Sequence, residues 1–160
     1  TVPGLSTDAV GTIESTERTI MAALWLRSPD CMVDPHDRSD RFELIAGCDG
    51  ATLARFANDV LEDDPPLSVR QDPRPKVVMQ QVVEPVERRP FNLGDVVVTP
   101  AEVELDGHRG FAMIPGKAER AALSGAIVDA AVAGGHPLTD EIATELTATA
   151  TDRQARRRRA

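Results

Sequence analysis

Hydrophobic residues recur every three or four positions in four segments of the chain. This spacing predicts helices over about 14–27, about 50–61, 118–132 and 139–158. Residues 28–40 carry two prolines and four aspartates, which indicates a polar connector after the first helix. The short apolar run Phe42–Ala46 predicts an extended piece before the second helix.

The pattern changes to that of strands between residues 69 and 114. β-Branched residues fill 77–83 and 95–105, and 110–114 returns as a partner strand after the hairpin turn at Asp106-Gly107. Phe91–Gly94 predicts a turn, and Pro100 predicts a bulge or break. The expected fold class is α+β: N-terminal helices, an antiparallel sheet centred on 76–114, one buried helix after the hairpin and a C-terminal helical arm.

Breakers and charge runs divide the chain into three parts. Residues 1–12, with Pro3 and two glycines, are expected to be a flexible leader. Residues 13–135 are expected to form a single α+β domain. Residues 136–160 are expected to form the helical arm, which ends in an arginine-rich tail.

The helix predicted over 118–132 is apolar nearly all the way round. Such a helix is either deeply buried in its own chain or buried by a partner. We therefore name four of its residues as a possible subunit interface: Leu123, Ile127, Asp129 and Val132. The Asp129 carboxylate needs a partner there, which favours a salt bridge or cap at an interface over catalysis.

Composition narrows the classes of function. Hydrophobic residues make up 41% and charged residues 28%, which is typical of a globular protein. With neither a long apolar run nor a signal-like start, we expect a cytoplasmic protein with no membrane partner. The net charge is −8. Without the five arginines of the tail, residues 1–152 hold 26 acidic and 13 basic residues, so a nucleic-acid partner is not expected. This acid-rich, lysine-poor composition fits either a halophilic host or a GC-rich genome.

The segment Gly110–Ala118 is the best candidate for a ligand site. A phosphate-binding P-loop needs four residues between its glycines and a hydroxyl residue after the lysine. Here five residues intervene and Ala118 takes the place of the hydroxyl residue. Two readings stay open: an anion contact at Gly116 and Lys117, or a plain strand-to-helix turn.

No other chemistry assembles from the sequence. Cys31 and Cys48 are expected to be free thiols, and no spacing of Cys and His matches a metal motif. The serines lack the setting of an activated nucleophile. We therefore expect no catalytic residue, no metal and no cofactor in this chain.

Three segments resemble the PhnG family, a subunit of the bacterial carbon–phosphorus lyase system. They are Phe91–Thr99, Val103–Gly107 and Ala118–Ala130, together with Gly110 and Gly116. The resemblance covers about residues 75–133. It implies a non-catalytic structural subunit of the complex that makes α-D-ribose 1-methylphosphonate 5-triphosphate, in which a phosphonate displaces adenine from ATP.

The resemblance also implies partners. PhnG proteins occur with PhnI, PhnH and PhnJ subunits, with the ATP-binding-cassette protein PhnL as a possible further partner, and as a homodimer. ATP and Mg²⁺ would be used by the complex, with the nucleosidase chemistry in PhnI and the radical step in PhnJ.

The chain departs from the family pattern at several charged positions. Val83, Pro100 and Lys117 stand where the family usually has arginine, Ala118 stands where it has aspartate, and Asp95 replaces glutamate. Any anion contact carried by those arginines is therefore in doubt here. Two other functions stay open: an independent enzyme with an anion site at Lys117 and Asp129, and an acidic binding or regulatory module acting on an unrelated protein through its apolar helix.

Overall fold

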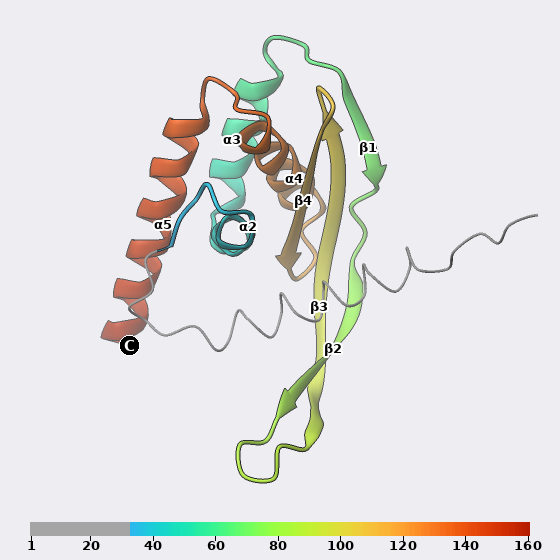
Figure 1. The fold of residues 1–160 in the computed structure, drawn as a ribbon, viewed down its shortest axis with the longest axis vertical. Coiled ribbons are helices and arrows are strands. Elements are labelled where there is room, and N and C mark those ends of the chain that lie inside the picture. The colour runs from blue at the N-terminus through green and yellow to red at the C-terminus, as the bar shows by residue number, and fades with distance from the viewer. Residues whose placement is uncertain (1–32) are drawn as a thin grey trace, which may run out of the picture. The chain divides into compact units, whose positions relative to one another are not determined.

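The computed structural model describes residues 33–160, which form one compact unit. The leader, the helix predicted over 14–27 and Cys31 lie outside the described residues. The elements, labelled in Figure 1, are α2 (Arg38–Gly47), α3 (Gly50–Leu61), β1 (Leu67–Gln71), β2 (Lys76–Val83), β3 (Pro90–Leu105), β4 (His108–Pro115), α4 (Glu119–Ala133) and α5 (Thr139–Arg159).

The sheet is built around the long strand β3, and every pairing is antiparallel. β4 pairs with residues 98–105 of β3. β1 and β2 lie one after the other along the opposite edge, with Leu67 opposite Leu105 and Val83 opposite Pro90. The far half of β3 therefore pairs only with β2, and this two-stranded part extends beyond the helices (Figure 1).

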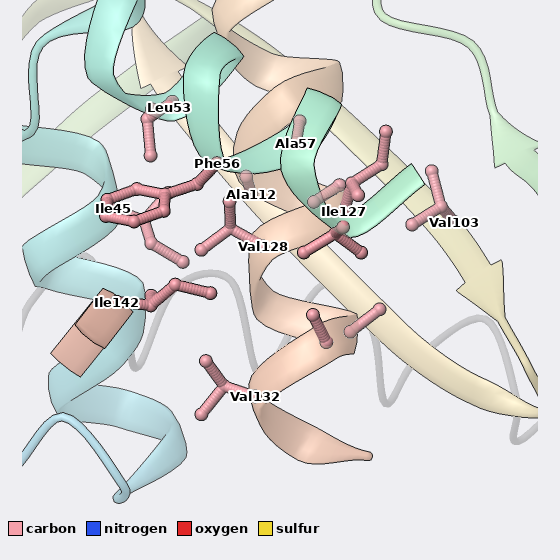
Figure 2. Packing of buried hydrophobic residues seen from close by; sticks show 14 of the residues in the cluster. Ile45, Leu53, Phe56, Ala57, Val103, Ala112, Ile127, Val128, Val132 and Ile142 are labelled. Atoms are coloured by element: carbon pink, nitrogen blue, oxygen red, sulfur yellow. The ribbon is translucent and has the colours of Figure 1, made fainter. Parts of the chain in front are cut away.

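The helices cover one face of the sheet, and α4 is the central element of this layer. It packs on β3 and β4 on one side and on α2, α3 and α5 on the other. Figure 2 shows Phe56, Ile45 and Ile142 on the side of Val128 of α4, and Ala57 and Val103 on the side of Ile127. The α+β class and the order of helices, sheet and helices are confirmed.

The prediction of an extended piece at Phe42–Ala46 is wrong, because these residues belong to α2. The Asp37 carboxylate accepts hydrogen bonds from the backbone N–H groups of Ser39 (3.0 Å) and Asp40 (3.1 Å) and so begins the helix. Phe42 and Ile45 are then both buried, at the three-residue spacing of one helix face.

The predicted turn at Phe91–Gly94 is also wrong, since these residues lie inside β3. The chain reverses earlier, between β2 and β3. There the Glu84 carboxylate accepts the N–H groups of Val86 and Glu87, both at 2.8 Å, and the Glu84 N–H donates to the Arg89 carbonyl at 3.0 Å. The Asn-Leu-Gly sequence resembles a turn, but the side chain that organises the real turn is an acid seven residues before Phe91.

Pro100 neither breaks β3 nor displaces its register with β4, contrary to the prediction. The Gly116 N–H donates to the Val97 carbonyl (2.8 Å), which places the backbone groups of odd-numbered β3 residues on the β4 edge. Pro100 therefore turns its missing N–H toward the other edge, where residues 72–75 separate β1 from β2. The interruption predicted for β3 at Pro100 therefore occurs instead on the neighbouring edge, between β1 and β2.

The hairpin at Asp106-Gly107 and the helices over 50–61, 118–132 and 139–158 are confirmed. Both hairpin residues have positive φ, 47° and 78°. The helix layer approaches the sheet closely at Gly110 of β4, where a Cβ would lie 2.0 Å from the Ala126 carbonyl oxygen. A second glycine, Gly125 of α4, faces Ile45 and Ala112 in the same way. Glycine at position 110 lets α4 lie directly on the backbone of the sheet, and glycine at position 125 leaves room for the side chains of Ile45 and Ala112.

Candidate functional site

The four residues named as a possible subunit interface lie on α4, and three of them are buried inside this chain. Ile127 is 3% exposed, Asp129 2% and Val132 8%, while Leu123 is half-buried. Ile127 and Val132 belong to the hydrophobic core shared by the sheet and the other helices (Figure 2). Of the four, Leu123 is the residue with most surface left to offer another chain.

Asp129 forms a buried ion pair with Arg41 of α2. The Arg41 Nε donates to Asp129 Oδ1 at 2.5 Å, and the other carboxylate oxygen accepts the Phe111 N–H at 2.9 Å. The two side chains are 5% and 4% exposed. Arg41 Nη1 also donates to the carbonyl of His36 at 3.1 Å. The salt bridge expected for Asp129 is therefore present, and it lies within the chain.

A stacked pair of rings lies beside this ion pair. The rings of Phe42 (α2) and Phe111 (β4) are parallel, with centroids 5.8 Å apart. The ion pair connects α2 to α4, and the stacked rings connect α2 to β4. Sequence reasoning identified Asp129 as a residue that needs a partner but missed Arg41, which lies 88 positions away and directly before the segment predicted to be extended.

The turn at Gly116-Lys117 is organised by Thr99 of β3. The Thr99 hydroxyl donates to the Gly116 carbonyl (2.7 Å) and accepts the Ala118 N–H (3.1 Å), while Gly116 has φ 83°. Thr99 is fully buried, and Lys117 is exposed. The Ala118 N–H, one of the groups at the start of α4 that have no partner within the helix, is therefore already hydrogen-bonded within this chain. The anion contact at Gly116 and Lys117 stays a prediction.

The three positions at which the family pattern has arginine lie apart in the fold. Val83 ends β2 and is 62% exposed, whereas Pro100 is buried in the middle of β3. Lys117 lies in the exposed turn before α4. Val83 and Lys117 both have room for a longer charged side chain, but the site of Pro100 does not.

The described part of the chain offers little material for a metal or redox site. Within residues 33–160 no group of three or more His, Cys, Asp or Glu side chains lies close enough to hold a metal ion. Cys48 is a free, half-buried thiol, and burial raises its pKa above the ordinary value. Among these residues no helix is long and apolar enough to span a membrane.

Sequence reasoning missed the most unusual surface of the described chain, the β2–β3 hairpin, by which we mean residues 76–97. It carries most of the exposed large hydrophobic side chains found in residues 33–160, namely Val77, Met79, Val83, Val86, Phe91, Leu93 and Val97. A strand with one buried face and one solvent-exposed face alternates apolar and polar residues. The runs Val77-Val78-Met79 and Val96-Val97-Val98 do not alternate, and that signal could have revealed a strand with two apolar faces.

These features define an α+β protein whose buried polar groups serve its own packing and whose exposed apolar surface suits contact with another chain. Residues 36–160 match the family of phosphonate metabolism protein PhnG. Because the match spans well over half of the chain, the protein belongs to the PhnG family, which works in phosphonate metabolism as part of the carbon–phosphorus lyase complex. No curated protein matches the chain.

Proposed function

We propose that this chain is a non-catalytic structural subunit of the complex that makes α-D-ribose 1-methylphosphonate 5-triphosphate. In this role it supports the displacement of adenine from ATP by a phosphonate, while other subunits carry the reacting groups, ATP and Mg²⁺. The observation that carries the proposal is the family match over residues 36–160.

The geometry of the described residues supports a structural role. Buried polar side chains are used in packing: Asp129 pairs with Arg41, and Thr99 bridges the turn before α4. The exposed apolar residues of the β2–β3 hairpin favour a chain that works in contact with others.

The proposed partners are PhnI-, PhnH- and PhnJ-type subunits, a PhnL-type protein in the active assembly, and a second copy of this chain. A cytoplasmic location is part of the proposal. The alternative, an acidic module that uses its apolar helix on an unrelated protein, loses support because Ile127 and Val132 are buried in this chain. The alternative of an independent enzyme would need Asp129, which is already paired.

The test is co-expression of the full chain with the PhnI-, PhnH- and PhnJ-type proteins of the same genome, followed by size-exclusion chromatography with light scattering. We expect one co-eluting complex. With the PhnL-type protein, ATP, Mg²⁺ and methylphosphonate, adenine release should require this chain. A chain that elutes alone and is dispensable for adenine release would overturn the proposal, and adenine release by the isolated chain would favour the independent enzyme.

A further inference from the structure

The β2–β3 hairpin continues the sheet face that α4 covers. Ala101, Val103 and Leu105 of β3 are buried under α4, and their side chains share one face because they alternate along the strand. The register from Leu105 to Gly94 has no shift against β4 or β2, so the alternation places Val97 on that same face. Its partner Val77 is directly opposite, and Met79 follows on β2.

The helical cover stops where this face continues. α4 begins at Glu119, and the Ala118 N–H before it is held by Thr99, which is only two residues from Val97. Beyond this point the face carries four exposed apolar residues, Val77, Met79, Val83 and Val97, which are 66%, 60%, 62% and 37% exposed. It also carries the polar residues Gln81 on β2 and Asp95 opposite Met79 on β3. A two-stranded ribbon is marginally stable in water, so a ribbon with this face uncovered lacks the packing that stabilises the rest of the sheet.

The shape of this face fits a single helix. Two strands lie about 4.8 Å apart, so one helix with a diameter of about 10 Å covers a two-stranded ribbon. Six residue steps separate Val77 from Val83, or about 20 Å at about 3.3 Å per step. A helix covers that length with about 13 residues, at about 1.5 Å each.

Charge distinguishes the hairpin from the rest of the molecule. Residues 76–97 hold three acidic and three basic residues, whereas the whole chain has a net charge of −8. The hairpin is therefore a neutral surface on an acidic protein. The long-range field of the acidic chain therefore attracts a less acidic or basic partner to this surface more strongly than it attracts a second copy of this chain.

We propose that the face of the β2–β3 hairpin formed by Val77, Met79, Val83 and Val97 is the docking site for an amphipathic helix of a partner subunit. The helix extends the α4 layer past Ala118, with its apolar stripe on the hairpin and neutral or basic residues on its outer side. This inference rests on the proposed function, because the partner is another subunit of the same complex.

The test compares the full-length wild-type chain with Val77→Lys and Met79→Lys in the co-expression assay. Both side chains are exposed, so the variants should keep the circular dichroism spectrum and melting temperature of the wild type. We expect at least a tenfold loss of co-eluting partner. The matched control is Val69→Lys, because Val69 is an exposed apolar residue opposite Val103 on the same sheet face but outside the hairpin. It should co-elute like the wild type.

A photo-crosslinking amino acid in place of Met79 then identifies the occupant within the purified complex. The expected crosslink joins position 79 to a partner-subunit peptide with apolar residues at three- and four-residue spacing. A crosslink to a second copy of this chain, or to another part of the same chain, overturns the proposal. The proposal is also overturned if the Met79→Lys variant forms the complex as well as the wild-type chain does. That result would leave the proposed function intact. A wild-type chain that finds no partner overturns the proposed function and this inference together.

Discussion

At the scale of single residues, the described chain uses its buried polar groups to connect elements that lie far apart in sequence. Arg41 and Asp129 are both almost completely buried and are joined to each other and to the Phe111 backbone. A buried ion pair adds little net stability compared with apolar packing, but removing one partner leaves a buried charge without compensation. The pair therefore favours one arrangement of α2 on α4 over others.

Asp129→Ala should lower the free energy of unfolding by about 3–5 kcal/mol, because Arg41 would remain buried without its partner. The measurement is urea unfolding followed by circular dichroism. In the double variant Arg41→Met with Asp129→Leu neither charge of the pair remains, and much of the loss should be recovered. If Asp129→Ala alone were as stable as the wild type, the ion pair would not hold α2 in place.

Cys48 should react slowly with iodoacetamide in the folded chain. Burial raises the pKa of its thiol, so the fold favours the protonated form. The stability that is linked to the protonated Cys48 thiol is complete below the ordinary thiol pKa. It is lost as the pH rises through the higher pKa that the thiol has in the folded chain. Peptide mass spectrometry at pH 8–9 should show slower alkylation of Cys48 in buffer than in urea, and equal rates would contradict this.

At the scale of elements, side chains of one strand determine how the next helix begins. β4 leads into α4 through Gly116, whose φ of 83° suits glycine, and Thr99 of the neighbouring strand bridges this turn. The interruption between β1 and β2 lies opposite Pro100, so β3 passes through a proline without losing a hydrogen bond that a neighbour needs.

Thr99→Val should destabilise the chain by about 1–3 kcal/mol, because it keeps the shape of the side chain but leaves the partly buried Gly116 carbonyl and Ala118 N–H without their hydroxyl partner. Thr99→Ser keeps the hydroxyl and serves as the control, with a smaller loss from the missing methyl group. Thermal and urea unfolding of both variants measure the difference. A valine variant as stable as the serine variant would mean that water replaces the hydroxyl.

At the scale of the whole molecule, the exposed apolar side chains gather on a segment without net charge. The chain has a net charge of −8, while the β2–β3 hairpin balances three acidic against three basic residues and carries most of the exposed large apolar side chains of the described residues. α5 has acids in its first turn and arginines in its last, an order that complements the helix dipole. The last four arginines of the tail, Arg156–Arg159, also reduce the negative charge of the molecule by four.

The melting temperature should rise with salt, because screening weakens the repulsion among excess acidic groups. The screening length falls from about 10 Å at 0.1 M to about 3 Å at 1 M salt. A chain without residues 156–160 would have a net charge of −12 instead of −8 and should show a larger rise. Differential scanning calorimetry in NaCl measures both, and a melting temperature that falls with salt would contradict this account.

These scales also explain which sequence predictions succeeded. Long periodic segments such as 118–132 and 139–158 were predicted correctly, since helical spacing is a property of the segment itself. Phe42–Ala46 failed because a short apolar run suits a strand or a helix, and the capping carboxylate of Asp37 decided between them. Phe91–Gly94 failed because turn-like residues were drawn into a strand by pairing with β2.

For the candidate sites, too, local sequence predicted some features, whereas others depended on tertiary contacts. The amino-acid sequence by itself determined the α+β class, the hairpin at Asp106-Gly107, the apolar character of α4 and the need of Asp129 for a partner, because each follows from neighbouring residues. Only the tertiary structure decided that α4 is covered by its own chain, that Arg41 pairs with Asp129, and that the helices of residues 33–160 leave the β2–β3 hairpin uncovered. Burial and pairing depend on which distant segments meet, and one chain's local pattern does not contain that information.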